Sequence, residues 1–185
     1  MTVFEQFLVE TEYYVYCDDD FVFNTNTNLD SFLDIIEKTG YDLIGGGVGT
    51  TSLNTWRRHG KYKVKRGSTG YCVNRENGFY GTLEGFKNCQ VGDVVANFFI
   101  ARTLTAGTVR FDPLFKQIAH REYFLDAIGK LRIAVWLVII NNVIPLLSNN
   151  YVMTSLCGNY VMTISAHTLQ WITSHKHVKV VWLTT

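Results

Sequence analysis

The segment YYVYCDDD, residues 13–20, decides the fold, because a short run of aromatic and β-branched residues stops at three consecutive acids. Such a run is typical of a buried strand. The sequence therefore predicts a strand over residues 13–17 that carries Asp18, Asp19 and Asp20 at its carboxyl end.

Three adjacent carboxylates repel one another, and a divalent cation with oxygen ligands offsets that repulsion. On a strand, Asp18 and Asp20 project to the same side while Asp19 points away. An Asp-x-Asp pair of this kind can hold Mn²⁺ or Mg²⁺, and through the ion the diphosphate of a sugar nucleotide. The alternative is a solvated acidic turn, since NTNTN follows at residues 24–28.

The next segments predict a helix and a second strand. The apolar residues of the helix follow the spacing of one buried face, at Leu29, Phe32, Leu33 and Ile36. Asn28 or Thr27 can cap its start, and Gly40 is expected to end it. YDLIGGGVG (41–49) is then a strand running into three glycines. A strand, a helix and another strand in this order are typical of an α/β domain.

Four further segments have a readable pattern. Residues 50–75 are polar and basic and predict a long loop or an irregular hairpin, and residues 93–102 predict a compact strand or a short helix. IAHREYFLDAIGK (118–130) predicts a helix closed by Gly129, and LRIAVWLVII (131–140) begins a strand.

Composition limits the classes of function. The chain has 185 residues, 47% of them apolar, and a net charge of +1, so its length suits one core and its charge does not indicate nucleic-acid binding. No signal or membrane anchor is expected: the start lacks a basic region before an apolar run, and the longest apolar stretch, Ile133 to Leu147, is interrupted and falls short of the ~20 residues of a spanning helix. A buried strand pair is the expected structure there.

A second group of possible catalytic residues lies in HREYFLD (120–126). On a helix, Glu122 and Asp126 are four residues apart and share a face. A carboxylate in this position could act as a general base that takes the proton from a sugar hydroxyl. The alternative is an exposed amphipathic helix with ordinary surface acids.

Three other features each have two interpretations. The basic run from Trp56 to Arg66 could bind a phosphate or a sialic acid carboxylate, or it could be a charged edge strand. The triplet Gly45–Gly47 permits close approach to a ligand or a tight turn. Cys72 and Cys89 flank a glycine-rich loop and could form a disulfide or remain buried thiols, and the chain has no CxxC pair for structural zinc.

Taken together, five blocks resemble one family. In chain order they are YVYCDDDFVF, NLDSFLDIIEKTGYDLIGG, GFKNCQVGDVVANFFIART, VRFDP and AHREYFLDAIGKLRIA. Their order and spacing are similar to those of the β-1,4-N-acetylgalactosaminyltransferases, which extend galactosyl glycolipids and glycoproteins. The resemblance covers roughly Thr11 to Val135.

The resemblance implies an α/β GT-A glycosyltransferase domain, with a Rossmann-like mixed sheet, a UDP-N-acetylgalactosamine donor, a glycan acceptor, Mn²⁺ (or Mg²⁺) and inversion at the anomeric carbon. It also implies an enzyme of the Golgi lumen, held by an amino-terminal anchor that is not expected within these residues. By this resemblance, Asp18 and Asp20 would bind the metal, and Asp18 and Asp19 would bind the nucleotide. Asp93 and Asn97 would face the sugar pocket. Glu122 would be the general base, with Asp126 as the second choice.

The resemblance also bears on the cysteines and on the tail. Cys72 and Cys89 match family cysteines, so we expect a disulfide between them. After Val135 the match stops, the family's Asp-His pair is missing, and no acid follows Asp126.

We therefore expect two parts: residues 1–135 as the carboxyl-terminal part of a GT-A catalytic domain, and residues 136–185 as a divergent apolar tail. The first half of the sheet would be absent, as in a truncated gene product. A chain of this kind is expected to be inactive by itself. The alternative function is a non-catalytic remnant or interaction protein that keeps half of a GT-A scaffold.

Overall fold

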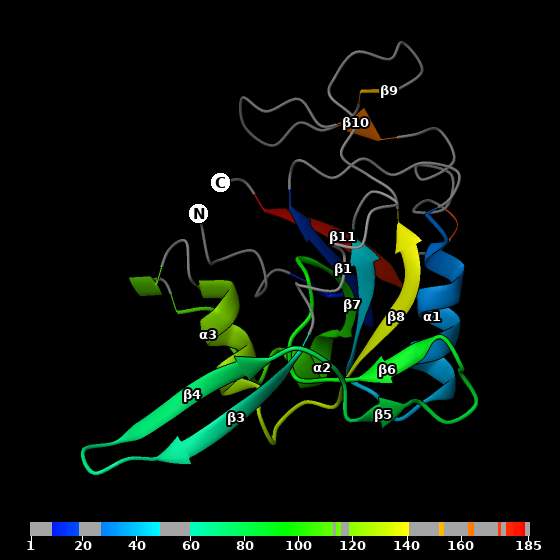
Figure 1. The fold of residues 1–185 in the computed structure, drawn as a ribbon. Helices are drawn as coiled ribbons and strands as arrows, with labels where there is room; N and C mark the ends of the chain where they lie inside the picture. Colours follow the sequence, from blue (N-terminus) through cyan, green and yellow to red (C-terminus); the bar gives the residue numbers. More distant parts are fainter. Residues whose placement is uncertain are drawn as a thin grey trace.

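A computed structural model of the chain describes residues 9–18, 27–48, 60–112, 114–115, 119–140, 152–153, 163–164, 174 and 177–183 (Figure 1). Its elements in chain order are β1 (Tyr13–Asp18), α1 (Leu29–Lys38), β2 (Leu43–Val48), β3 (Lys61–Arg66), β4 (Tyr71–Glu76), β5 (Gly81–Thr82), β6 (Cys89–Val91), β7 (Phe98–Arg102), α2 (Thr103–Ala106), α3 (Ala119–Asp126), β8 (Ile133–Ile140), β9 (Val152–Met153), β10 (Thr163–Ile164) and β11 (Val178–Leu183).

One mixed sheet organises these elements, with the strand order β11-β1-β7-β2-β8-β6-β5. Strand β1 is parallel to β11, strand β2 is parallel to β8, and β7 runs antiparallel to both β1 and β2. The strands β1, β2, β8 and β11 therefore point the same way, and their carboxyl ends meet at one edge of the sheet (Figure 1). The expectation of a mixed α/β sheet is confirmed.

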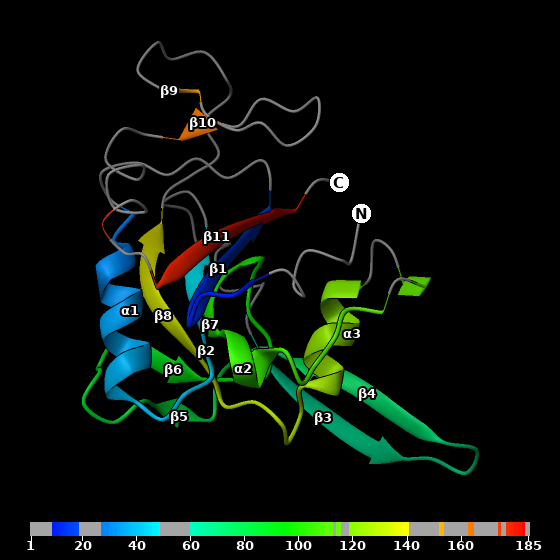
Figure 2. The same cartoon turned by 180° about the vertical axis from the view of Figure 1, so that it is seen from behind.

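Alternation along β1 divides the core into two layers. Tyr13, Val15 and Cys17 pack on the face covered by α1, whereas Tyr14 and Tyr16 pack with α2 and α3 on the other face. Figure 2 shows α1 and α3 on opposite sides of the sheet. Because both faces are covered, the inner strands have the continuous apolar sequence that was visible in YYVYC.

Helix α1 begins as its sequence predicts. The Asn28 side chain accepts a hydrogen bond from the backbone N–H of Ser31 at 3.0 Å, which satisfies one of the unpaired donors of the first turn. The helix ends at Lys38, and Thr39, rather than Gly40, is the cap residue. The prediction of the helix is confirmed, and Gly40 is the first residue beyond its cap, where a glycine that ends a helix is expected.

The glycine triplet lies in strand β2, so it is not a tight turn, and packing explains two of its three glycines. A Cβ atom on Gly45 would collide with the side chain of Val95, and one on Gly46 would lie 2.5 Å from Phe98 and 2.8 Å from Phe32. Real Cβ atoms do not approach that closely, so both glycines are required for packing between β2 and its neighbours.

The remaining strands show which of the alternative structures expected from the sequence is formed. Residues 61–76 form a regular antiparallel hairpin of β3 and β4, and β7 is a strand. The chain from residue 133 to 140 is a single strand, β8, which crosses the expected boundary at residue 135, and residues 141–147 lie outside the described part.

The tail also contributes to the sheet, because β11 pairs along its whole length with β1. The backbone N–H of Tyr13 donates to the carbonyl oxygen of His177 at 3.1 Å, and the His177 ring meets the Tyr13 ring edge-on. His177 thus lies beside the amino end of β1, while His167 and His175 are outside the described residues.

The expected disulfide between Cys72 and Cys89 is wrong in this structure, where both thiols are free. Cys72 is exposed on the outer half of the β3–β4 hairpin. Cys89 is buried under α1 in strand β6, and burial raises the pKa of its thiol to about 12. The two residues belong to different sheets, so proximity in the sequence did not bring them together.

Among the described residues, no helix is both long and apolar enough to cross a membrane.

Arg102 ties three elements together, and its replacement is expected to destabilise the fold. Its guanidinium donates to the carbonyl oxygens of Tyr41 (3.2 Å) and Ile36 (2.5 Å) and to the Tyr13 hydroxyl (3.0 Å). In Arg102→Ala these acceptors lose charged donors, so we expect a loss of about 3 kcal/mol in the free energy of unfolding, measured by urea denaturation. The exposed Arg66→Ala is the control and should change it by less than about 0.5 kcal/mol. Equal effects would contradict this role for Arg102.

Candidate functional site

The strands β1, β2, β8 and β11 end at one edge of the sheet, which we call the carboxyl edge. Asp18, the first residue of the predicted metal site, lies at this edge. The edge is formed by the last residues of these strands, Asp18, Val48, Ile140 and Leu183. In sheets with parallel strands, ligands commonly bind beyond the carboxyl ends. The acidic triplet therefore starts at the edge where a ligand is expected, although Asp19 and Asp20 themselves lie outside the described residues.

Strand pairing places Asn97 at the same edge. Cys17 of β1 is opposite Phe98 of β7, so the next residue of the β1 backbone, Asp18, adjoins the residue before Phe98, Asn97. These two residues are 79 positions apart in the sequence. The antiparallel register thus brings the last residue of β1 beside the residue that precedes β7.

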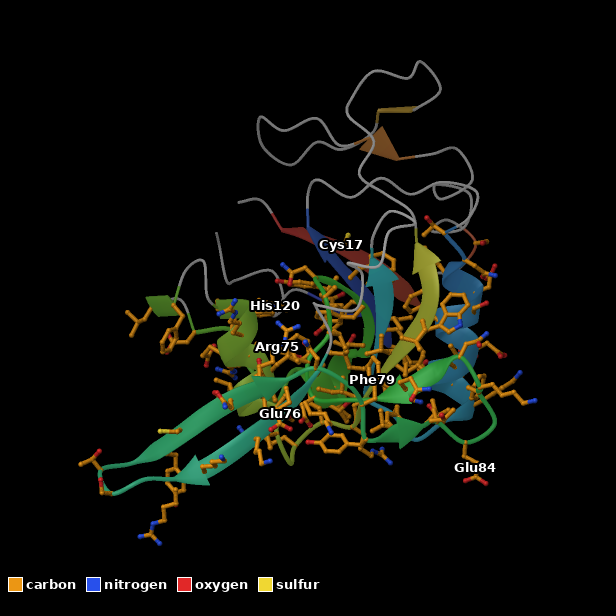
Figure 3. The ribbon with its side chains drawn as sticks, viewed as in Figure 1. Cys17, Arg75, Glu76, Phe79, Glu84 and His120 are labelled. Carbon is orange, nitrogen blue, oxygen red and sulfur yellow. The ribbon has the colours of Figure 1, made fainter. Side chains whose placement is uncertain are left out.

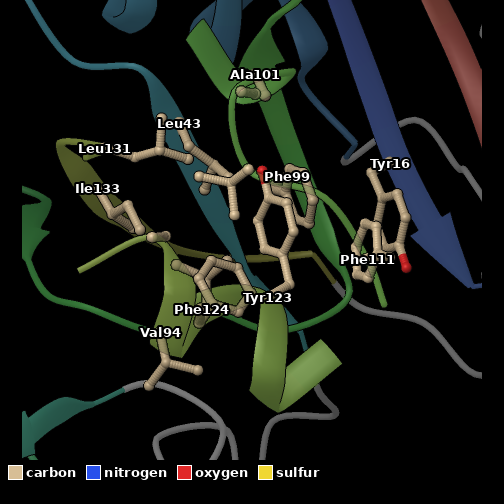
Figure 4. Packing of buried hydrophobic residues seen from close by; sticks show 14 of the residues in the cluster. Tyr16, Leu43, Val94, Phe99, Ala101, Phe111, Tyr123, Phe124, Leu131 and Ile133 are labelled. Atoms are coloured by element: carbon tan, nitrogen blue, oxygen red, sulfur yellow. The ribbon is translucent and has the colours of Figure 1, made fainter. Parts of the chain in front are cut away.

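A stack of aromatic rings joins the end of β1 to helix α3 (Figure 4). The Tyr16 ring stacks on Phe111 with centroids 5.4 Å apart, and Phe111 stacks on Tyr123 at 4.4 Å. The ring of Phe99 of β7 also stacks on Tyr16, with centroids 4.6 Å apart. Because Tyr16 is two residues before Asp18 and Tyr123 directly follows Glu122, this stack fixes α3 relative to the end of β1.

Glu122 is held at the half-buried rim of this stack. Its Oε2 accepts a hydrogen bond from the backbone N–H of Asp112 at 3.3 Å. Burial raises the pKa of the Glu122 carboxyl, the Asp112 N–H opposes that rise, and the neighbouring Asp126 carboxylate adds to it. Such an environment suits a carboxylate that has to accept a proton near neutral pH.

Asp126 is the exposed partner of Glu122, one turn further along α3. The predicted shared face is confirmed, because the two side chains interact. Asp112 is the residue that the sequence reasoning did not single out. The block VRFDP contains it, but only the folded chain shows that its backbone N–H contacts Glu122.

Asp93 lies away from the carboxyl edge, next to the amino end of β8. Its carboxylate Oδ2 accepts hydrogen bonds from the Tyr62 backbone N–H at 2.7 Å and from the Tyr80 hydroxyl at 2.6 Å. The hydrogen bond from Tyr80 to Asp93 is the largest cause that raises the pKa of the Tyr80 hydroxyl to about 12, and burial is the second. In this structure Asp93 therefore fastens the base of the β3–β4 hairpin, and the structure does not bring it together with Asn97.

Within the described residues, no group of three or more His, Cys, Asp or Glu side chains is arranged to hold a metal ion. Of the predicted metal ligands, Asp20 lies outside the described part, and only the backbone of Asp18 is described.

The raised pKa of Glu122 gives a direct prediction. Carbon NMR of the carboxyl group should show a midpoint above the ordinary value for glutamic acid. In Asp126→Asn the midpoint should fall, because the neighbouring negative charge is removed. As a matched control, Asp34→Asn on α1 should leave the midpoint unchanged. A midpoint at or below the ordinary value in the parent would contradict the half-buried position of Glu122 beside Asp126.

The same shift predicts how stability depends on pH. A carboxyl whose pKa is higher in the folded than in the unfolded chain stabilises the fold below the unfolded pKa and loses that contribution as pH rises through the folded pKa. As the pH rises from the unfolded to the folded pKa of Glu122, the free energy of unfolding of the parent should therefore fall relative to that of Glu122→Gln. Urea denaturation at several pH values measures this difference.

Comparisons with known proteins find a consistent set of relatives. The chain is 43% identical over 129 residues to beta-1,4 N-acetylgalactosaminyltransferase 1 of Rattus norvegicus and 41% identical over 127 residues to that of Homo sapiens, which is 68% of this chain and 24% of each relative. It is 36% identical over 123 residues to beta-1,4 N-acetylgalactosaminyltransferase 2 of Mus musculus, covering 66% of this chain and 23% of that protein.

No family model and no solved structure matches the chain. The chain spans about a quarter of the length of the curated relatives that it matches. Since several relatives with the same enzyme name share about two fifths of the residues over two thirds of this chain, it belongs to the β-1,4-N-acetylgalactosaminyltransferase family.

Proposed function

We propose that this chain is part of the catalytic domain of an inverting GT-A glycosyltransferase. The enzyme would transfer N-acetylgalactosamine from UDP-N-acetylgalactosamine to a galactose-terminated glycan, with or without sialic acid, in the Golgi lumen. The observation that carries the proposal is the identity of 43% over 129 residues to a named N-acetylgalactosaminyltransferase.

The geometry supports the same reaction through two groups of residues. The acidic triplet begins where β1 ends, and Glu122 lies on the helix that the aromatic stack joins to that strand. In the proposed reaction Glu122 takes the proton from the acceptor hydroxyl as its oxygen attacks the anomeric carbon. The bond from that carbon to the diphosphate breaks on the opposite side, which inverts the configuration.

The residues at the carboxyl edge fit a hard divalent cation. Carboxylate oxygens are the ligands that Mn²⁺ and Mg²⁺ prefer. Asn97, which the pairing of β1 with β7 brings beside Asp18, adds an amide at the same edge. Asp18 and Asp20 would hold the ion, and Asp19 would contact the nucleotide. A bound ion there would neutralise the negative charge that develops on the diphosphate leaving group.

A chimera tests the proposal. The segment of the rat relative that matches this chain would be replaced by this chain's own residues, and transfer from UDP-N-acetylgalactosamine to a galactose-terminated glycan would be measured. Transfer above that of a chimera carrying Asp20→Asn and Glu122→Gln together is the expected result. A correctly folded chimera with no more activity than this double variant would favour a non-catalytic interaction protein instead.

A further inference from the structure

The hairpin of β3 and β4 is the most strongly charged part of the described chain. It projects from the body of the molecule in both views (Figures 1 and 2). Its sixteen residues from 61 to 76 carry one acid, Glu76, against Lys61, Lys63, Lys65, Arg66 and Arg75. The whole chain has a net charge of only +1, so positive charge is concentrated on this ribbon.

The strand register gives the ribbon two different faces. One face carries the lysines of β3, with Lys61 opposite Glu76, Lys63 opposite Asn74 and Lys65 opposite Cys72. The other face carries Tyr62 opposite Arg75, Val64 opposite Val73 and Arg66 opposite Tyr71. Directly opposed residues share a face, so aliphatic and aromatic side chains gather on one side with arginines at both ends.

Within the described part of the chain, the apolar face is covered near the body. Tyr62 packs against the core cluster that contains α3, and Figure 3 shows Arg75 and Glu76 where the ribbon meets the body. Further out, Val64 is 49% exposed, Val73 is 42% exposed and Tyr71 is 71% exposed. A two-stranded ribbon gains nothing from exposing these side chains to water, and such a patch is typical of an interaction surface.

We propose that the outer half of this ribbon, Val64 to Val73, docks on an anionic lipid surface. Each basic residue near such a surface is attracted by its negative potential, and tyrosine and aliphatic side chains enter the interfacial layer. Lysine is depleted from the cores of protein–protein interfaces, which disfavours a protein partner. Lysines that protect a strand edge would explain β3, but they would not explain the exposed valines and Tyr71.

This inference does not rest on the proposed transferase activity, and vesicle binding tests it separately. The chain is sedimented with vesicles of phosphatidylcholine alone or of phosphatidylcholine mixed with phosphatidylserine. Binding to the mixed vesicles is expected, with little binding to phosphatidylcholine and a loss as ionic strength rises. Equal binding to both vesicles, or binding to neither, would overturn the proposal.

Two sets of variants separate charge from apolar contact. The pair Lys65→Glu and Arg66→Glu should weaken binding by about tenfold or more, whereas the control pair Lys87→Glu and Lys130→Glu changes the net charge equally and should retain it. The variant Tyr71→Ser keeps the charge and should also weaken binding.

The proposal would be wrong if the control pair lost as much binding as the ribbon pair, or if Tyr71→Ser had no effect. It would also be wrong if soluble glycerophosphoserine displaced the chain from vesicles, because a headgroup site needs no lipid surface. All these changed residues are exposed, so the melting temperature of each variant should stay near that of the parent.

Discussion

Replacing Asp20 by Asn in the chimera with the rat relative is expected to reduce Mn²⁺-dependent transfer by about a thousandfold or more. A carboxylate that binds the ion contributes several kcal/mol to stabilising the charge on the leaving diphosphate. The amide of Asn keeps the size of the side chain and removes its charge, so the loss should reflect the metal contact. Initial rates at several Mn²⁺ concentrations measure the effect.

The control is Asp34→Asn on α1, which removes a half-exposed acid that forms a surface ion pair with Lys38. Such pairs contribute about 0–1 kcal/mol to stability, so this variant should keep the activity of the chimera. If Asp20→Asn retained activity within a few fold of the parent, the acidic triplet would be a solvated turn, and the metal site would have to lie elsewhere.

The sequence predicted the elements around the site because their signals are local. The apolar run of β1 and the cap of α1 at Asn28 are both determined by neighbours a few residues away. The shared face of Glu122 and Asp126 follows in the same way from helical spacing. Periodicity and capping are readable without any knowledge of the distant parts of the chain.

Contacts between distant segments could not be predicted in this way. The adjacency of Asp18 and Asn97 depends on the register of two antiparallel strands, which a pattern of apolar residues does not specify. The same limit explains the wrong disulfide. A glycine-rich loop joins Cys72 to Cys89, but the first lies on an exposed hairpin and the second in the core, and loop sequence does not encode that separation.

Charge composition likewise did not indicate how the tail packs. The absence of acids after Asp126 indicated a segment of different origin, yet β11 aligns with β1 from Tyr13 to Asp18. An apolar strand such as VKVVWL supplies backbone hydrogen bonds whatever its charge. Beside β1, it covers the strand edge that ends at the acidic triplet. The tail therefore contributes to the support of the predicted metal position.

Replacing Glu122 by Gln should lower kcat by about 10²–10⁴-fold, the usual contribution of a general base. The apparent affinity for the donor should change little, because Glu122 is assigned to the acceptor proton. Gln keeps an oxygen that can accept the Asp112 N–H, so the local structure should persist. The exposed Glu84→Gln is the control and should keep the parent rate.

The pH dependence distinguishes a base from a structural residue. Only the ionised carboxylate accepts a proton, so the rate of the parent should rise with pH as Glu122 ionises. Its pKa is raised by burial and by Asp126, so this rise should occur above the ordinary range of a glutamic acid. In Asp126→Asn the rise should move to lower pH with the plateau retained within a few fold, and in Glu122→Gln it should disappear. If Asp126→Asn abolished activity while Glu122→Gln retained both the rate and the pH profile, then Asp126 would be the base, and Glu122 would be the residue that positions it.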